Sequence, residues 1–316
     1  MNSRLTTVAG AQSSPLVLGT NVFGWTADEE ISHWILDRYV QTGGNFIDTA
    51  DSYSFWASGN TGGESERIIG SWLRGRTDRD ELLIASKVSH HPDLSGLAPQ
   101  TIRTAVDGSL QRLGVDYLDI YYAHFDDPDT ELEESIASFS ALVDAGKIRA
   151  IGISNYSAPR IEQWLEITKR EGFHAPVAIE PLYNLMERGI EADILPLARR
   201  NELALFPYYS LAHGFLSGKY RAGANQDSAR ASDAAQYATA QGERVLQTLE
   251  QIATARGTQL SSIALAWLRT QPGVTAPIAS ARTLGQLEPL LKTMHLELDD
   301  EESSRLAEAS EPIAVA

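Results

Sequence analysis

The 316-residue sequence contains no cysteine, so it can form no disulfide, no thiolate metal site and no cysteine nucleophile. A chain without cysteine suits a reducing compartment, and we expect a cytoplasmic protein. Basic residues are in the minority, with 26 Lys and Arg against 42 Asp and Glu, and the formal net charge is −16. Because nucleic acids and anionic membranes are bound by basic surfaces, we expect neither as a partner.

Long apolar runs are also absent from the sequence. The first residues, MNSRLTTVAGAQSSP, lack the continuous apolar segment of a signal peptide, and no stretch approaches the length of a membrane-spanning helix. The composition, 43% hydrophobic and 22% charged, is that of an ordinary globular protein with a sizeable core. We therefore expect a globular chain that does not enter a membrane.

Short apolar runs alternate with helical patterns along the chain. The candidate strands are 15–20, 45–50, 82–88, 118–125, 148–154, 177–183, 203–209 and 275–280. Among the helices between them, one is predicted to begin at Pro99 and end at Gly114, which suit a first helical turn and a helix stop. Another is predicted to begin with a capping box of Thr130 and Glu133 and to end at Gly146. Two more are predicted over 161–172 and 261–273.

Strands that alternate with helices favour a parallel sheet, because each helix returns the chain to the same end of the sheet. Eight such units in 316 residues favour a closed (β/α)8 TIM barrel, an α/β fold, with residues 1–316 as a single domain. Two short apolar segments in the first 20 residues predict an N-terminal β-hairpin at the barrel floor. The polar segment 217–242 is predicted to be a mobile loop.

Ionisable side chains follow three consecutive strands of this predicted barrel, where active sites of such barrels lie. Asp48 ends the second strand and Tyr53 lies in the loop after it, while Lys87 and His124 end the third and fourth strands. Taken singly, each is more often structural: a lysine at a strand end reaches solvent, and a histidine or tyrosine packs. Because these residues lie at or just after the ends of neighbouring strands, we expect them to form a catalytic site.

The segments NFIDTADSY, ASKV, YYAHFDDP, GISN, PLYNLMER and PYYSLAHGFLSGKY resemble, in this order, the aldo-keto reductase superfamily. The resemblance extends from LGT at 18–20 to PIASARTLGQL at 277–287. It implies a (β/α)8 barrel that interconverts carbonyl compounds and alcohols with NADPH and no metal. The catalytic tetrad that it implies is Asp48, Tyr53, Lys87 and His124.

The chemistry of this tetrad explains why an acid and a phenol stand close together in NFIDTADSY. A phenol with its ordinary pKa near 10 is a poor proton donor, and we expect the ammonium of Lys87 to lower the pKa of Tyr53. Asp48 would hold Lys87 charged and oriented, so that Tyr53 acts as general acid and, in reverse, as general base. His124 would hydrogen-bond the substrate oxygen. Asp51 is expected to be a solvated or capping residue.

The resemblance implies NADP(H) as the cofactor, in preference to NAD(H), and assigns contacts to its parts. The nicotinamide end is assigned Thr20, Asn21, Asp48, Ser154, Asn155, Glu180, Tyr208 and its neighbour Tyr209. The pyrophosphate is assigned Ser210, Leu211, Ala212, Gly214 and Lys219. The adenosine 2′-phosphate and adenine are assigned Ser280, Arg282 and Gln286. Gln286 has an alternative role, because Thr283 and Gln286 also form a capping box that needs no ligand.

Two positions depart from the pattern of the family. Pro289 and Leu290 stand where a Glu-Asn pair usually reaches adenine, so adenine recognition is expected to differ. Glu180 stands where the family usually has the glutamine that contacts the carboxamide. An ionised Glu180 would favour the oxidised, cationic ring, whereas a protonated Glu180 would behave as glutamine does.

Aromatic side chains at the strand ends predict an apolar substrate pocket. Trp25, Trp56 and Phe125, with Phe55 beside them, form its expected rim, although each could also simply pack loop on loop. Tyr53 and His124 are the expected polar contacts of a small carbonyl or alcohol substrate. His90 and His91 have no third ligand nearby in sequence, so no metal site is expected.

Two other classes of function stay open at this point. One is a non-catalytic NADPH-binding regulatory subunit, as in the potassium-channel β subunits that share this fold; the presence of His124 favours an enzyme. The other is a barrel isomerase or lyase that forms a Schiff base on Lys87, which the candidate cofactor residues disfavour. The sequence predicts no particular oligomeric state.

Overall fold

The computed structural model describes residues 7–220 and 231–311. Its main sheet has eight parallel strands in the order β11-β10-β9-β8-β5-β4-β3-β12. Their bounds are β3 Val17–Gly19, β4 Phe46–Asp48, β5 Leu83–Val88, β8 Leu118–Ala123, β9 Ile148–Ser154, β10 Pro176–Glu180, β11 Ala204–Leu205 and β12 Ile278–Ala279. All eight predicted strands are confirmed, several of them shorter than their apolar runs.

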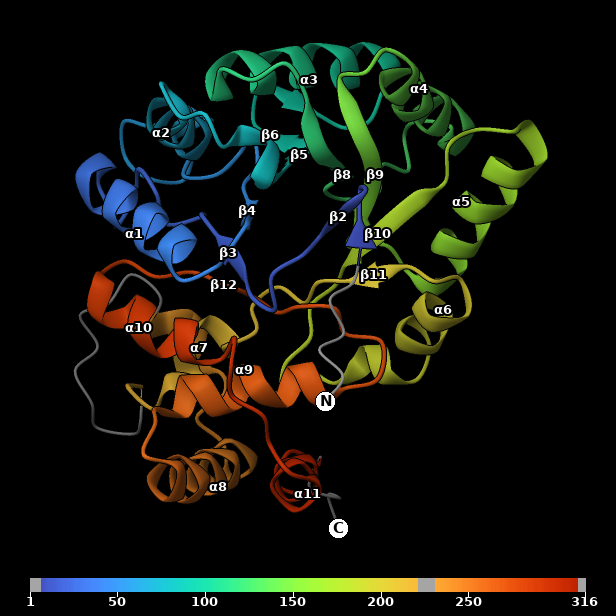
Figure 1. Cartoon of the computed structure of the whole chain (residues 1–316). Helices are drawn as coiled ribbons and strands as arrows, with labels where there is room; N and C mark the ends of the chain where they lie inside the picture. The colour runs from blue at the N-terminus through green and yellow to red at the C-terminus, as the bar shows by residue number, and fades with distance from the viewer. Residues whose placement is uncertain (1–6, 221–230, 312–316) are drawn as a thin grey trace.

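The two ends of this strand order are joined, so the sheet closes into a barrel. Thr275 N donates to Leu205 O and Ile278 N donates to Pro207 O, each over 2.8 Å. Figure 1 shows the strands as an inner ring with the helices around it. The predicted (β/α)8 barrel is therefore confirmed.

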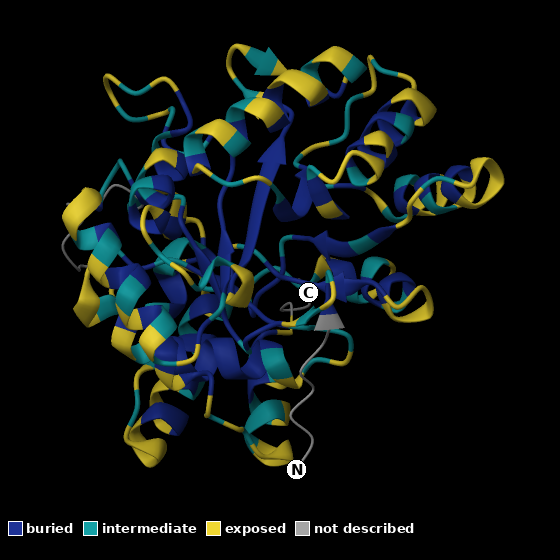
Figure 2. Cartoon of the chain, turned by 45° about the horizontal axis from the view of Figure 1, so that its top comes forward, coloured by how far each residue is buried: buried dark blue, intermediate teal, exposed yellow. Residues whose placement is uncertain are grey.

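The helices form the outer layer, and their outward faces are the exposed parts of the molecule (Figure 2). They are α1 Glu29–Gln41, α2 Glu64–Leu73, α3 Pro99–Leu113, α4 Leu132–Asp144, α5 Ala158–Glu171, α6 Ile194–Arg200, α7 Ala231–Ala235, α8 Ala240–Arg256, α9 Leu260–Thr270, α10 Leu284–Lys292 and α11 Asp300–Ala309. Short 3₁₀ turns are η1 Arg79–Glu81, η2 Gly189–Glu191 and η3 Ala212–Ser217. No helix of residues 7–220 and 231–311 is both long and apolar enough to cross a bilayer.

Local signals at the helix ends were only partly predictive. Pro99 lies in the first turn of α3, and Gly114 ends that helix with a left-handed φ of 67°, as expected. The predicted capping box at α4 is wrong, because Thr130 Oγ1 donates to Asp127 Oδ2 over 2.7 Å and the N-cap is Glu131. The helix begins one residue too late for the predicted box, which needs its threonine at the N-cap.

The segment 217–242 is not one loop throughout. It contains α7 and the first turn of α8, so the loop prediction is wrong there. The predicted mobility of its middle part, 221–230, lies outside the described residues.

The interior of the barrel is filled by a cluster of buried side chains that includes Val17, Phe46, Leu83 and Phe206. Phe46 and Phe206 meet edge to face, with ring centroids 5.1 Å apart. Val8 belongs to the same cluster. It lies in the predicted N-terminal hairpin, which is confirmed as β1 Thr7–Val8 paired antiparallel with β2 Ala11–Gln12. The hairpin crosses the centre of the ring (Figure 1) and closes one end of the barrel.

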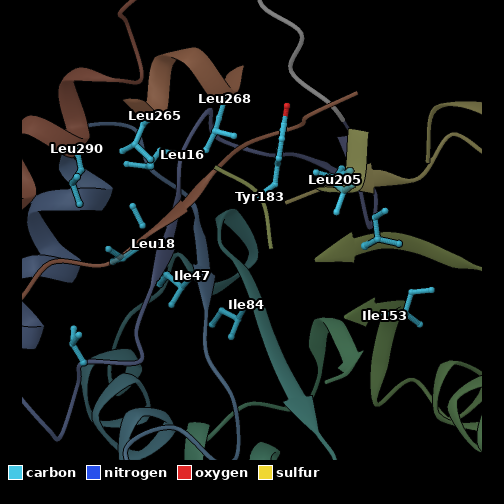
Figure 3. Close-up of a cluster of buried hydrophobic side chains, with 14 of the residues drawn as sticks. Leu16, Leu18, Ile47, Ile84, Ile153, Tyr183, Leu205, Leu265, Leu268 and Leu290 are labelled. Carbon is cyan, nitrogen blue, oxygen red and sulfur yellow. The ribbon is translucent and has the colours of Figure 1, made fainter. Parts of the chain in front are cut away.

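A second, larger cluster lies between the strands and the helices. Strand residues Leu18, Ile47 and Ile84 are fully buried in it, as are Leu265 and Leu268 of α9 (Figure 3). Burial of apolar surface on both faces of the strands explains their continuous apolar runs. The parallel register places Asp48 opposite Ala85 and Lys87 opposite Tyr122, so the charged strand ends share one rim.

Candidate active site

A cavity of about 420 Å³ opens at the carboxyl ends of the strands. Asp48, Tyr53 and His124 line it, together with Glu180 at the end of β10. Lys87 lies directly behind Asp48 and Tyr53 and is fully buried. The structure therefore brings the four predicted catalytic residues together at one place.

Lys87 is the centre of a buried hydrogen-bonded cluster. Its ammonium donates to both carboxylate oxygens of Asp48 over 2.6 and 2.7 Å and to the backbone oxygen of Thr49 over 3.0 Å. The same group donates to the hydroxyl of Tyr53 over 2.9 Å. Tyr53 in turn donates to Asp48 Oδ2 over 3.3 Å. The pair Asp48–Lys87 thus fixes the position of the phenol from two sides.

The direction in which the pKa of Tyr53 moves differs from the sequence prediction. Burial raises the pKa of Tyr53 well above its ordinary value, and the carboxyl groups of Asp48 and Glu180 add to the rise. The prediction that Lys87 lowers this pKa is wrong, because burial and two nearby carboxyl groups outweigh one ammonium. Tyr53 therefore keeps its proton at neutral pH. Burial also raises the pKa of Asp48, and the Lys87 ammonium limits that rise.

His124 is a neutral imidazole in this site. Burial lowers its pKa well below the ordinary value, and Lys87 and His90 contribute to the same direction. Its ring centroid lies 6.1 Å from that of Tyr53, on the cavity wall. A neutral imidazole has one N–H donor, so His124 can hydrogen-bond an oxygen that also approaches the Tyr53 hydroxyl.

The polar residues assigned to the nicotinamide end form a network between β9 and the chain after β11. Ser154 Oγ donates to the backbone oxygen of Glu180 over 2.8 Å, and Tyr208 OH donates to Asn155 Oδ1 over 2.6 Å. Asn155 Nδ2 donates to His124 O and to Ser154 Oγ, over 2.9 and 3.0 Å. Asn155 is held with a left-handed φ of 59°. Both N–H groups of its amide are thus engaged, while Oδ1 can accept one further hydrogen bond.

Two predicted cofactor contacts lie behind the cavity wall. Thr20 is fully buried, and its hydroxyl donates to Asp48 O and accepts from Ser65 Oγ, both over 2.8 Å. Ala212 is also fully buried. Neither residue lines the cavity, and their role as cofactor contacts stays a prediction. Thr20 instead supports the backbone of Asp48.

The other residues assigned to the pyrophosphate do line the cavity: Ser210, Leu211, Gly214 and Lys219. The chain between them takes a turn in which Ala212, His213 and Gly214 have positive φ values of 48°, 55° and 93°. Residues other than glycine rarely adopt this backbone conformation, so the turn is strained. Within the turn, the backbone N–H groups of Ala212 and Gly214 donate to Tyr209 O and Leu211 O, over 2.7 and 2.8 Å.

The end of the cavity near α10 holds Asn21, Ser280, Arg282 and Gln286. Ser280 Oγ donates to Asn21 Oδ1 over 2.9 Å. Gln286 acts in the helix cap, since its N–H donates to Thr283 Oγ1 and its side-chain oxygen accepts from Arg282 N over 3.0 Å. No carboxylate of residues 7–220 or 231–311 forms an ion pair with Arg282. Its half-buried guanidinium is available to an anion at this helix start.

The aromatic rim is present at the mouth of the cavity. Trp25, Trp56 and Phe125 line it, and Trp25 meets Trp56 edge to face with centroids 5.8 Å apart. Phe55 packs on Trp56 behind this wall. Tyr209 lines the cavity beside Tyr208, and their centroids are 5.2 Å apart.

Several residues of the cavity wall were not predicted from the sequence, and His90 is the titratable one closest to the catalytic cluster. His90 lines the cavity, 4.8 Å from Phe125 and 5.9 Å from His124 between ring centroids. It lies in β6 His90–His91, which pairs with β7 Leu94–Ser95 in a small hairpin that the sequence did not suggest. The described residues contain no group of three or more His, Asp or Glu side chains that could hold a metal ion.

Asp51 does not lie in solvent. It is 1% exposed, and neither carboxyl oxygen has a hydrogen-bond partner among the described residues. The prediction of a solvated or capping residue is therefore wrong. Burial and the neighbouring Glu66 raise the pKa of Asp51 well above its ordinary value, so it is a neutral acid. Pro289 and Leu290, which depart from the family pattern, line the cavity.

Comparison with known proteins agrees with this site. The sequence model of the Aldo/keto reductase family matches residues 15–311. The uncharacterized oxidoreductase YrpG of Bacillus subtilis is 32% identical over 303 residues, which cover 92% of this chain and 90% of YrpG. Protein tas of Escherichia coli is 32% identical over 317 residues, 91% of each chain. Aldo-keto reductase YhdN of Bacillus subtilis is 32% identical over 308 residues, 93% of this chain and 88% of YhdN. Members of this family are oxidoreductases, and the present chain belongs to the aldo/keto reductase family.

Proposed function

We propose that this protein is an NADP(H)-dependent oxidoreductase that interconverts aldehydes or ketones with alcohols. The observation that carries the proposal is the buried cluster in which Lys87 holds the hydroxyl of Tyr53 at 2.9 Å, at the wall of a cavity shared with His124. A phenol that keeps its proton and faces a cavity is a general acid for a carbonyl oxygen. We also propose that residues 1–316 form one domain.

Each residue of the site has its own role in the proposed reaction. Tyr53 gives its proton to the carbonyl oxygen, and the N–H of His124 holds that oxygen in place. Lys87 is positioned to stabilise the phenolate that remains on Tyr53, and Asp48 holds the ammonium in place. The aromatic rim of Trp25, Trp56 and Phe125 favours an apolar part on the substrate. In alcohol oxidation, the same phenolate takes the proton back.

The cavity also fits a dinucleotide cofactor, which supplies the hydride when bound. Two buried polar atoms at its wall, Glu180 Oε2 and His124 Nδ1, have no partner among the described residues. The ammonium of Lys219 at the cavity wall suits a pyrophosphate, and Arg282 at the start of α10 suits the 2′-phosphate that distinguishes NADP from NAD. Tyr208 and Tyr209 are the aromatic faces available to a nicotinamide ring.

The experiment that tests this function is a panel of aldehydes, ketones and secondary alcohols, each assayed with NADP(H) and with NAD(H). We expect carbonyl-dependent oxidation of NADPH, and weaker activity with NADH. Binding of NADPH without oxidation by any carbonyl, even in a single turnover with enzyme in excess, would instead favour the regulatory subunit. Borohydride trapping of a carbonyl compound on Lys87 would favour Schiff-base chemistry.

A further inference from the structure

Glu180 shares the ammonium of Lys87 with Asp48. Glu180 Oε1 lies 3.5 Å from Lys87 Nζ, against 2.6 and 2.7 Å for the two oxygens of Asp48. Its other oxygen, Oε2, is buried and has no hydrogen-bond partner in the part of the chain that the structure describes. Glu180 is 3% exposed and yet lines the cavity. One cation therefore faces two carboxyl groups, and the longer contact belongs to Glu180.

Glu180 faces one carboxyl group and one ammonium among neutral phenols. Asp48 faces it from β4 and Lys87 from β5, while the neutral phenols of Tyr53, Tyr122 and Tyr208 complete the ring of titratable neighbours. Burial and the charge of Asp48 raise the pKa of Glu180 to about 8, although Lys87 opposes the rise. At neutral pH, Glu180 is thus mainly a carboxylic acid.

A cation that enters the cavity beside Glu180 changes this balance. A positive charge near a buried carboxyl group favours its ionised form. The oxidised nicotinamide ring is cationic and the reduced ring is neutral, while the phosphate groups of the two cofactors are the same. The two redox states therefore differ in their effect on a titratable wall residue, provided that the ring lies at this end of the cavity.

We propose that Glu180 couples a proton to the redox state of the cofactor. It gives up its proton when the oxidised cofactor binds and keeps it when the reduced cofactor binds. In this step the O–H bond of Glu180 breaks, the proton passes to the buffer, and no electrons are exchanged. The inference rests on the proposed function, because it assumes that NADP(H) occupies this cavity.

Proton coupling makes the affinity for the oxidised cofactor depend on pH. Below about pH 8, each unit of rising pH strengthens NADP⁺ binding by up to about tenfold, until Glu180 is ionised before the cofactor arrives. The affinity for NADPH lacks this dependence. Both cofactors carry the 2′-phosphate, so its own titration cancels in the comparison of the two.

The test is isothermal titration calorimetry at pH 7 in buffers of different ionisation enthalpy, which counts the protons released on binding. We expect NADP⁺ to release up to one proton more than NADPH. Glu180→Gln should abolish that difference, whereas Glu308→Gln, the same change at an exposed site on α11, should leave it intact. 2′-Phospho-ADP-ribose, which keeps the pyrophosphate and the 2′-phosphate but has no nicotinamide ring, should release no more protons than NADPH does.

Infrared difference spectroscopy on the unaltered protein provides a second measurement that does not depend on the folding of a variant. The band of a protonated carboxyl group should disappear when NADP⁺ is added and persist with NADPH. Equal proton release with both cofactors, or an unchanged difference in Glu180→Gln, would overturn the inference while leaving the proposed function standing. Failure of both cofactors to bind would instead overturn the proposed function.

Discussion

Lys87 and Asp48 form an ion pair with almost no access to solvent: their side chains are 0% and 2% exposed, and Nζ lies 2.6 Å from Oδ1. Removing two charges from water costs several kcal/mol for each ion, and mutual attraction only partly offsets this cost. Such a pair is a weak source of stability. The pair instead positions Tyr53, because the same ammonium donates a hydrogen bond to the hydroxyl of Tyr53.

Lys87→Met should destabilise the fold by about 3–5 kcal/mol, because it leaves the carboxylate of Asp48 buried without its partner. The double variant Lys87→Met, Asp48→Asn should recover much of this loss, since no unpaired charge remains. Urea denaturation of the parent, both single variants and the double variant measures the coupling between the two sites. A double variant no more stable than Lys87→Met would show that the buried charge is not the cause. Both variants should lack reductase activity.

Tyr53→Phe should reduce turnover of a carbonyl substrate by about 10²–10⁴-fold, because it removes the transferable proton and keeps the ring. The dissociation constant of NADPH, measured by fluorescence quenching, should change little. Tyr156→Phe is a matched control, since the hydroxyl of Tyr156 is buried, has no partner among the described residues and lies away from the cavity. Retention of most activity in Tyr53→Phe would exclude it as the proton donor.

Arg282→Ala should weaken NADPH binding by about 1.5–3 kcal/mol, the range for a lost hydrogen bond to a charged group, and should affect NADH binding much less. The reason is that only NADPH carries a 2′-phosphate for the guanidinium at the start of α10. Arg103→Ala, at an exposed position of α3, serves as the control. Equal losses for both cofactors would show that Arg282 does not read the 2′-phosphate.

The fold could be predicted from the sequence because the alternation of apolar runs and helices depends on burial, which acts along every strand. β4 and β5 are buried on both faces, and their runs read as continuous apolar segments. Strand-end placement then predicted that Asp48, Lys87 and His124 share one rim. These inferences need only the topology of a parallel barrel.

What the sequence could not predict depends on contacts between loops. The predicted cap of α4 failed because the N-cap is Glu131, while the hydroxyl of Thr130 donates to Asp127. The wall position of His90 depends on the small β6–β7 hairpin, for which the sequence has no strong turn signal. The pKa of Tyr53 is raised and not lowered as predicted, because burial and two nearby carboxyl groups act on it together. Their combined effect can be judged only from the three-dimensional structure.

Asp51 belongs to a buried polar cluster on the outer side of the rim, away from the cavity. Its neighbours include Glu66, which accepts from Ser86 Oγ and from Arg112 Nε, each over 2.6 Å. Glu66 has a partner for each carboxyl oxygen, whereas neither oxygen of Asp51 has one among the described residues. Asp51 is therefore the acid of this cluster that has no hydrogen-bond partner among the described residues, and burial opposes its ionisation.

Asp51→Asn should stabilise the protein near neutral pH. Burial raises the pKa of Asp51 in the folded protein above its value in the unfolded chain, which is about 3.9. Between these two pKa values, Asp51 is protonated in the folded state and ionised in the unfolded state, so the unfolded state binds fewer protons. The unfolding free energy of the parent then falls as pH rises through this window, by about 1.4 kcal/mol per pH unit, and the variant lacks this loss. Urea denaturation from pH 4 to pH 8 should therefore show an advantage of Asp51→Asn that is small at pH 4 and grows with pH. Asp116→Asn, at an exposed position, should show no such trend. A pH-independent difference between parent and Asp51→Asn would mean that Asp51 is ionised in the folded protein.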